Sequence, residues 1–150
     1  MRNLSAATVF GVTACVFCAI IAGSVPAMVV TSTDDHLAFL DARPVFKGHL
    51  LVVPKVHVVT LADLPADGVG PLFRFVRRLS VAVEAGLSAG GTFVANNNKV
   101  SQSVAHLHVH VVPRTKGDGL RGFFWPRTRY ASDEEAAGYA TRIAAALPSD

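Results

Sequence analysis

Residues 102–113 read Gln102-Ser103-Val104-Ala105-His106-Leu107-His108-Val109-His110-Val111-Val112-Pro113. Three histidines alternate here with apolar residues in a run rich in β-branched side chains, which favours a β-strand. Successive side chains of a strand point to opposite faces, so a strand over residues 105–112 would place the imidazoles on one face and the apolar residues toward a core. A solvated strand face more naturally carries Lys, Glu or Thr than three titratable rings. The pattern therefore indicates a functional site.

Three aligned imidazoles favour one of two chemistries. Histidine-rich tracts bind transition metals, and a histidine can also act as a nucleophile while its neighbours position the reacting groups. Residues two apart on a strand lie about 6.5–7 Å apart, which is awkward for three ligands on one ion. At most one or two of His106, His108 and His110 would share a metal, and the spacing suits nucleophilic chemistry better.

The remaining sequence predicts a single domain of mixed strands and helices, since 150 residues with 51% hydrophobic content suffice for a core. Apolar residues recur every three or four positions over residues 70–85, which predicts an amphipathic helix. Residues 50–53 are apolar on both faces and predict a central strand. The other expected elements are a short helix at 15–22, strands at 28–33, 37–40 and 92–95, and a helix from about 133 to 147.

Charge and cysteine content narrow the class of protein. A net charge of +3 and a pI near 9.2 suit an anionic ligand, but they are too small a bias to indicate nucleic-acid binding. Two cysteines three positions apart do not make the disulfide framework of a small secreted protein. They are typical of a metal-binding or thiol pair in a reducing compartment.

Four ordered motifs resemble those of the histidine triad (HIT) superfamily, in its bacterial Hint-like hydrolase branch. They are Cys15–Gly23, Asp34–Asp41, Gly48–His57 and the His-x-His-x-His run. The resemblance covers roughly residues 14–114. It implies an α+β HIT-like fold with an antiparallel sheet of about five strands, a long amphipathic helix, a short N-terminal helix and a C-terminal helix. Residues 1–13 are then a variable leader, and residues 115–150 are a basic, aromatic tail with a terminal helix.

The apolar amino-terminal segment imitates a targeting sequence. No charged residue lies between Arg2 and Asp34, and the run before Cys15 resembles a signal peptide or a lipoprotein cleavage site. Glycines and Pro26 interrupt this run before it reaches the ~20 residues of a membrane span. The resemblance also places the segment after Cys15 in a buried helix. We therefore expect a cytoplasmic protein with no membrane partner, and a membrane-anchored lipoprotein is the alternative.

The resemblance implies substitution at the α-phosphorus of a nucleotide. His108 would attack the phosphorus and form a nucleotidyl-histidine, which water or another acceptor then releases. His106 and His110 complete the catalytic group, with His110 on the phosphate. Gln102 and Ser103 would hold the non-bridging oxygens, although Ser103 is also compatible with a routine strand serine. The expected substrates are nucleoside phosphoramidates or dinucleoside polyphosphates, and the alternative is a nucleotide- or zinc-binding module with little or no catalysis.

The same resemblance implies the nucleotide-binding residues. Phe17 and Ile20 would line the base pocket, where the alternative is plain core packing. Asp41 would accept hydrogen bonds from the ribose hydroxyls, where the alternative is a turn aspartate bonded to its own backbone. Asn96 or Asn97 would contact phosphate. The loop that follows lacks the glycines that many HIT members carry, which leaves open both the choice of asparagine and the size of the leaving group.

Cys15 and Cys18 form a lone Cys-x-x-Cys, which is weak evidence of function by itself and lacks the context of a thioredoxin-like site. In some bacterial HIT proteins and in the related galactose-1-phosphate uridylyltransferases, two such cysteines and two histidines hold structural zinc. The matching residues here are Cys15, Cys18, His49 and His106, a tetrahedral Zn²⁺ donor set. The alternative is two small buried thiols. A zinc-bound His106 could not also protonate the leaving group.

The resemblance and the basic tail both indicate binding partners. We expect the chain to bind a purine nucleotide and to form a homodimer, as its relatives do. His36 and His57 are expected on the surface. Residues 114–130 contain five cations, one acid and four aromatic residues. This tail would either clamp a polyphosphate or close the dimer. Stacking on single-stranded nucleic acid is the least favoured alternative.

Overall fold

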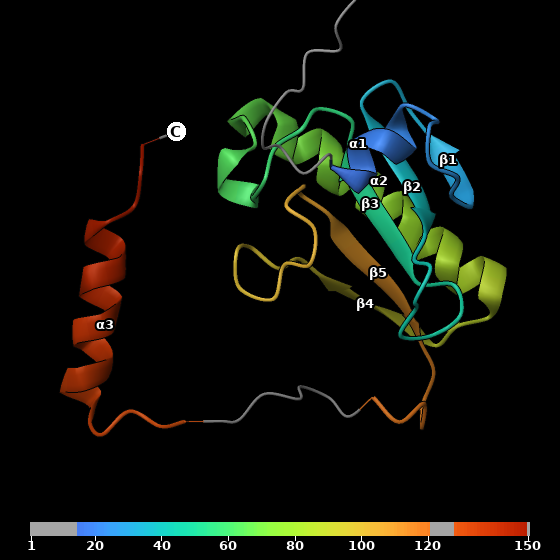
Figure 1. Cartoon of the computed structure of the whole chain (residues 1–150). Helices are drawn as coiled ribbons and strands as arrows, with labels where there is room; N and C mark the ends of the chain where they lie inside the picture. Colours follow the sequence, from blue (N-terminus) through green and yellow to red (C-terminus); the bar gives the residue numbers. More distant parts are fainter. Residues whose placement is uncertain (1–14, 121–127, 150) are drawn as a thin grey trace, which may run out of the picture. The chain divides into compact units, whose positions relative to one another are not determined.

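The computed structural model describes residues 15–120 and 128–149, so the predicted leader at 1–13 lies outside the described residues. The chain divides into two compact units, residues 1–116 and 117–150. The first unit holds a five-stranded sheet and the helices α1 (Val16–Ile21) and α2 (Ala66–Leu87), and the second holds the helix α3 (Asp133–Ala145) (Figure 1). Among the helices of the described residues, none has the length and apolar character needed to cross a bilayer.

The sheet has the strand order β1-β2-β3-β5-β4, and every pairing is antiparallel. β3 lies at its centre, and all five of its residues are buried because both faces are covered. The predicted α+β fold with an antiparallel sheet is confirmed. The strands are β1 (Val29–Ser32), β2 (His36–Leu40), β3 (Leu50–Pro54), β4 (Gly91–Ala95) and β5 (Val109–Arg114).

Each face of the sheet has its own hydrophobic cluster. On one face, α2 (Ala66–Leu87) packs a stripe of residues that includes Leu72 and Leu79 against the side chains of β3 and β5. On the other face, the short helix α1 (Val16–Ile21) packs Phe17 against Phe39 of β2 and Leu51 of β3. The face under α1 is the one that carries the histidines of the candidate site described below.

The triad segment becomes a strand later than the sequence predicts. β5 starts at Val109, so His106 and His108 precede it, because the backbone N–H of Leu107 donates to the carbonyl of Val58 instead of joining the sheet. The side-chain amide of Asn96 donates to the carbonyl of His108 at 2.9 Å. The pairing of β5 with β4 therefore ends at His110. The alternation of side chains nevertheless continues, since Leu107 is buried in the same cluster as the apolar residues of β5.

The helices match the expected positions with shifted ends. α2 begins at Ala66 rather than residue 70, because glycines and Pro71 interrupt the apolar pattern of its first turns. It ends at Leu87, and the next residue, Ser88, has the left-handed conformation. α3 (Asp133–Ala145) starts after Ser132, whose side chain accepts a hydrogen bond from the N–H of Glu135. A short 3-10 helix, η1 (Leu61–Asp63), follows the loop after β3.

Leu107 should anchor the triad segment to the core. It is fully buried between two histidines, so Leu107→Ala is expected to lower the free energy of unfolding by about 2–5 kcal/mol. Val100, which is 82% exposed, provides a matched control. Val100→Ala should change the free energy of unfolding by no more than about 0.5 kcal/mol. Denaturant unfolding measures both values. A loss below about 1 kcal/mol in Leu107→Ala would contradict the anchoring role.

Candidate active site and metal centre

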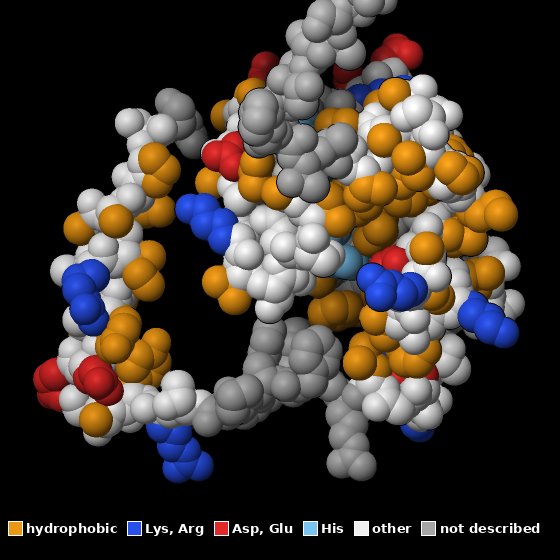
Figure 2. Space-filling model, in the orientation of Figure 1, with side chains coloured by type: hydrophobic (Ala, Val, Ile, Leu, Met, Phe, Trp, Pro, Cys, Tyr) orange, Lys and Arg blue, Asp and Glu red, His pale blue; other side chains and the backbone are white. Residues whose placement is uncertain are grey.

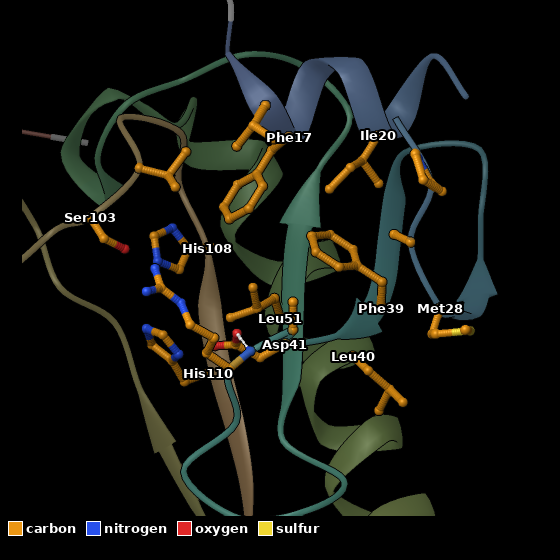
Figure 3. Close-up of a pocket in the computed structure, with 16 residues that line it drawn as sticks. Phe17, Ile20, Met28, Phe39, Leu40, Asp41, Leu51, Ser103, His108 and His110 are labelled. Atoms are coloured by element: carbon orange, nitrogen blue, oxygen red, sulfur yellow. Dashed lines mark hydrogen bonds between the residues drawn. The ribbon is translucent and has the colours of Figure 1, made fainter. Parts of the chain in front are cut away.

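A cleft of about 720 Å³ opens beside the triad on the α1 face of the sheet. Phe17 and Ile20 project into it from α1, and His108 and His110 face it from the triad segment (Figure 3). Figure 2 shows hydrophobic side chains gathered on this face of the first unit, with a histidine visible among them. The apolar wall opposite two imidazoles suits a flat apolar group joined to an anion.

His108 is held in one tautomer by the backbone. Its Nδ1 lies 2.7 Å from the carbonyl oxygen of His106, and a carbonyl can only accept, so Nδ1 carries the proton. In the neutral ring, the lone pair is therefore on Nε2. The ring is 2% exposed and rests edge-on against Phe17, with 5.2 Å between ring centroids. This neutral form is the one that a nucleophilic imidazole requires.

His106 is oriented differently, toward the two cysteines and His57. Its Nε2 lies 2.8 Å from the carbonyl oxygen of Pro54, to which it must donate. The remaining lone pair on Nδ1 points at Cys15 Sγ (3.4 Å), Cys18 Sγ (3.6 Å) and His57 Nδ1 (3.2 Å). These four atoms, all within 4.8 Å of one another, form a candidate metal centre, called the Cys₂His₂ cluster below.

The spacing within the Cys₂His₂ cluster fits zinc. Tetrahedral Zn²⁺ with ordinary bond lengths separates two nitrogen ligands by about 3.3 Å and a nitrogen from a sulfur by about 3.5 Å. The two Nδ1 atoms here are 3.2 Å apart, and three of the nitrogen–sulfur distances are 3.3–3.6 Å. Burial, together with the neighbouring Cys15, raises the pKa of the Cys18 thiol, so a cation is needed to hold this residue as a thiolate.

The structure corrects the predicted ligand set, because His57 stands where His49 was expected. Both histidines belong to the same sequence motif, but they flank opposite ends of β3. His57 follows the end near α1, and its Nδ1 reaches the cluster although the residue is exposed. His49 precedes the other end and contacts His110. The expectation of a surface position is also wrong for His36, which is 7% exposed and stacks on Phe75.

The predicted nucleotide-binding residues divide into two groups. Phe17, Ile20, Asp41 and Ser103 all line the cleft, whereas Gln102 does not: its amide accepts from the N–H of Lys99 and donates to the carbonyl of Val59. The two predicted asparagines, Asn96 and Asn97, also do not line the cleft.

Asn96 and Asn97 differ sharply in their surroundings. The amide nitrogen of Asn96 donates to the carbonyl of His108. The Oδ1 of Asn96 is buried without a hydrogen-bond partner among the described residues. Asn97 is exposed. Asn96 is therefore the asparagine that contacts the triad.

Arg43 is a cleft residue that the sequence interpretation missed. Its backbone N–H donates to Asp41 Oδ1 at 2.9 Å, so the turn that shapes Asp41 also brings a cation to the cleft. The only signal in the sequence was its place two residues after a predicted ribose ligand.

A family model of the HIT domain matches residues 22–117. The chain belongs to the HIT family. An uncharacterized HIT-like protein of Mycobacterium tuberculosis is 40% identical to it over 134 residues, which are 88% of this chain and 93% of that protein. Adenosine 5'-monophosphoramidase hnt1 of Schizosaccharomyces pombe is 30% identical over 121 residues, which are 80% and 89% of the two chains. Hydrolases therefore occur within the HIT family.

One solved HIT structure is relevant to the metal centre. The Zn-bound histidine triad family protein from Mycobacterium smegmatis has a TM-score of 0.69 and 39% sequence identity, and the match covers 89% of this chain and 94% of that one. Zinc binding thus occurs in a HIT protein similar to this chain.

Zinc stoichiometry should discriminate between the two candidate histidine ligands. We expect about one equivalent of Zn²⁺ per chain in the wild type and a loss of most of it in His57→Ala, because the cluster then lacks one of its four ligands. His49→Ala is the matched control and should retain the metal. Elemental analysis after dialysis against a weak chelator measures both. Retention in His57→Ala together with loss in His49→Ala would reverse the assignment.

Acid should destabilise the metal-free protein through its histidines. Four histidines have a lowered pKa, and burial is the main cause in each: His36, His49, His106 and His110. The pKa of His110 falls to about 4. The unfolded chain takes up protons near pH 6.5 while the folded rings stay neutral, so the free energy of unfolding falls as pH drops from about 7 toward 4. Urea midpoints of EDTA-treated protein at about pH 7, 6 and 5 measure this. A constant midpoint would contradict it.

Proposed function

We propose that this chain is a nucleotide hydrolase or transferase that acts at an α-phosphate through a covalent nucleotidyl-His108 intermediate. The observation that carries the proposal is the Nδ1–H bond of His108 to the carbonyl of His106, which leaves the Nε2 lone pair on a ring that lines the cleft. Membership of a family that includes a named adenosine monophosphoramidase supports the same reaction class.

In the first step, Nε2 of His108 would form a bond to the α-phosphorus, and the bond to the leaving group would break with its electron pair on that group, which takes up a proton from solvent. The positive charge that develops on the ring is stabilised by the hydrogen bond from Nδ1 to the backbone carbonyl. In the second step, water would attack the phosphorus and lose a proton to solvent, and the P–N bond would break with its electron pair on Nε2. This releases a nucleoside monophosphate and restores the neutral imidazole. Transfer to another acceptor follows the same path.

Residues of the cleft would contact each part of a nucleotide. Phe17 and Ile20 would pack on the base, for which we propose a purine, and Asp41 would accept the ribose hydroxyls. His110 and the hydroxyl of Ser103 would hold the phosphate oxygens. The leaving group would be an amine, as in a phosphoramidate, or a second nucleotide, as in a dinucleoside polyphosphate. The guanidinium of the exposed Arg43 would pair with the extra phosphates of a dinucleoside polyphosphate.

His106 would take a structural role in this scheme. Its Nε2–H is committed to the carbonyl of Pro54 and its Nδ1 to the Cys₂His₂ cluster, so it has no proton to give to a leaving group. Zn²⁺ bound in the cluster would tie α1 to the triad segment. Because that site needs reduced cysteines, and both are free thiols, a cytoplasmic location is proposed.

We also propose that the chain is a homodimer. Within the described residues, β4 is an edge strand of the sheet, and Val94 on it is 42% exposed. An edge strand with exposed apolar residues is a ready surface for pairing with another chain. Sedimentation equilibrium would give the molecular mass, and a monomer at micromolar concentration would contradict the proposal.

A second candidate is a nucleotide- or zinc-binding module with little or no catalysis. It is favoured by Gln102, which was expected at the phosphate, because both ends of its amide are bonded to backbone groups of loops instead. The phosphate site would then have fewer donors than a HIT hydrolase is expected to use.

Substitution of the nucleophile discriminates between these two functions. Wild-type protein is expected to turn over adenosine phosphoramidate, diadenosine polyphosphate or adenylyl sulfate, and His108→Ala should lower that turnover on the order of 10³-fold or more. Affinity for AMP should change only a few-fold, since the cleft walls persist. Acid-quenched wild type should carry a nucleotidyl mass on the His108 peptide, and His108→Ala should not. AMP binding without turnover of any substrate in wild type would favour the binding module.

A further inference from the structure

His49 is a buried histidine that neither the metal cluster nor the proposed reaction uses. It is 3% exposed and lies directly before β3, next to the cleft residues Asp41 and His110. The backbone N–H of Val45 points at its Nδ1 from 3.1 Å. A backbone N–H is always a donor, so this ring nitrogen must accept and carries no proton. The proton of the neutral ring is therefore on Nε2.

That proton has one acceptor in reach. Nε2 of His49 lies 2.9 Å from Nδ1 of His110, and two lone pairs at this distance would repel. His49 must donate, so Nδ1 of His110 accepts and the proton of His110 is on its own Nε2. The backbone amide of Val45 thus determines, through His49, which nitrogen of a cleft histidine is protonated.

We infer that His49 is a positioning residue, which fixes His110 as a hydrogen-bond donor toward the phosphate by donating its Nε2–H to Nδ1 of His110. The inference rests on the proposed function for its consequence, but the tautomer itself follows from the hydrogen bonds. Burial lowers the pKa of His49 and, mainly by the same cause, lowers that of His110 to about 4, which agrees with two neutral rings.

Adjacent rings of the cleft then have opposite roles. His108 presents a lone pair, because its Nδ1–H is bonded to a carbonyl, whereas His110 presents an N–H. Their ring centroids are 5.0 Å apart, so one phosphoryl group can meet both. If His110 took the other tautomer, its lone pair would face the phosphate oxygens and repel them. The arrangement therefore separates nucleophile from donor without placing a permanent charge on either ring.

The carboxylate of Asp41 is not part of this chain of hydrogen bonds. Its Oδ2 is 3.7 Å from Nδ1 of His49, which is beyond hydrogen-bond range, and that nitrogen is already satisfied by Val45. A metal ion shared by Asp41, His49 and His110 is the competing interpretation of the same cluster. Against it, the 2.9 Å between the two ring nitrogens is shorter than the about 3.3 Å of two nitrogens on one zinc ion.

The test compares His49→Leu, which removes the donor, with His49→Gln, whose amide N–H can replace it. In the full-length, zinc-loaded protein, His49→Leu is expected to lower kcat on the order of 10- to 100-fold with little change in KM, and His49→Gln should recover most of the loss. The ¹⁵N spectrum of the His110 ring should show Nε2–H in the wild type and in His49→Gln. In His49→Leu, it should show a mixture of tautomers.

Several results would overturn the inference. One is an unchanged Nε2–H tautomer of His110 in His49→Leu. Another is an equal loss of kcat in both variants, which would indicate a merely structural role. A second equivalent of zinc that disappears with His49 would establish the metal site instead. Zinc content and the denaturation midpoint of each variant report whether it folds. If wild type turns over no substrate, the proposed function fails while the ¹⁵N spectrum still decides the tautomer.

Discussion

The hydrogen bond from Nδ1 of His108 to the carbonyl oxygen of His106 is the interaction on which the rest of the site depends. A neutral imidazole has one proton and two nitrogens, and only the nitrogen without the proton can attack phosphorus. The carbonyl of His106 can only accept a hydrogen bond, whereas a hydroxyl side chain or a water molecule can either donate or accept. The chain therefore has to leave the regular ladder just before β5, so that the carbonyl of His106 accepts from the His108 ring rather than from a neighbouring strand.

The same device recurs around the site. His106 is fixed by the carbonyl of Pro54, and His49 by the backbone amide of Val45. Each of these backbone groups belongs to β3 or to a segment flanking it, and β3 is the most buried strand. Tautomers set by a rigid, central backbone do not depend on pH or on solvent in the way that tautomers set by surface carboxylates do. Buried histidines are costly to protonate, so the packing and the hydrogen bonds favour the same neutral state.

Much of this arrangement could be predicted from the sequence, and the failures have physical causes. Strict alternation placed the three histidines and the residues between them on the correct faces, since burial of Leu107 requires it even outside a strand. Helix α1 and the cleft positions of Phe17 and Asp41 followed from the ordered motifs. The choice between His49 and His57 could not follow, because it depends on which end of β3 lies under α1, a property of the tertiary fold. The loop role of Gln102 likewise depends on a contact with Val59, 43 residues away in sequence.

The Cys₂His₂ cluster and the cleft share one small element, and this links their stabilities. Cys15 caps α1 by accepting the N–H of Cys18, while Phe17, between them in sequence, touches the rings of both His106 and His108. A helix of six residues is too short to be stable by itself. Its position therefore comes from the cluster on one side and from the packing of Phe17 on Phe39 on the other. A metal held by the two cysteines would thus act on the cleft without touching a substrate, because it fixes the wall against which the base is proposed to pack.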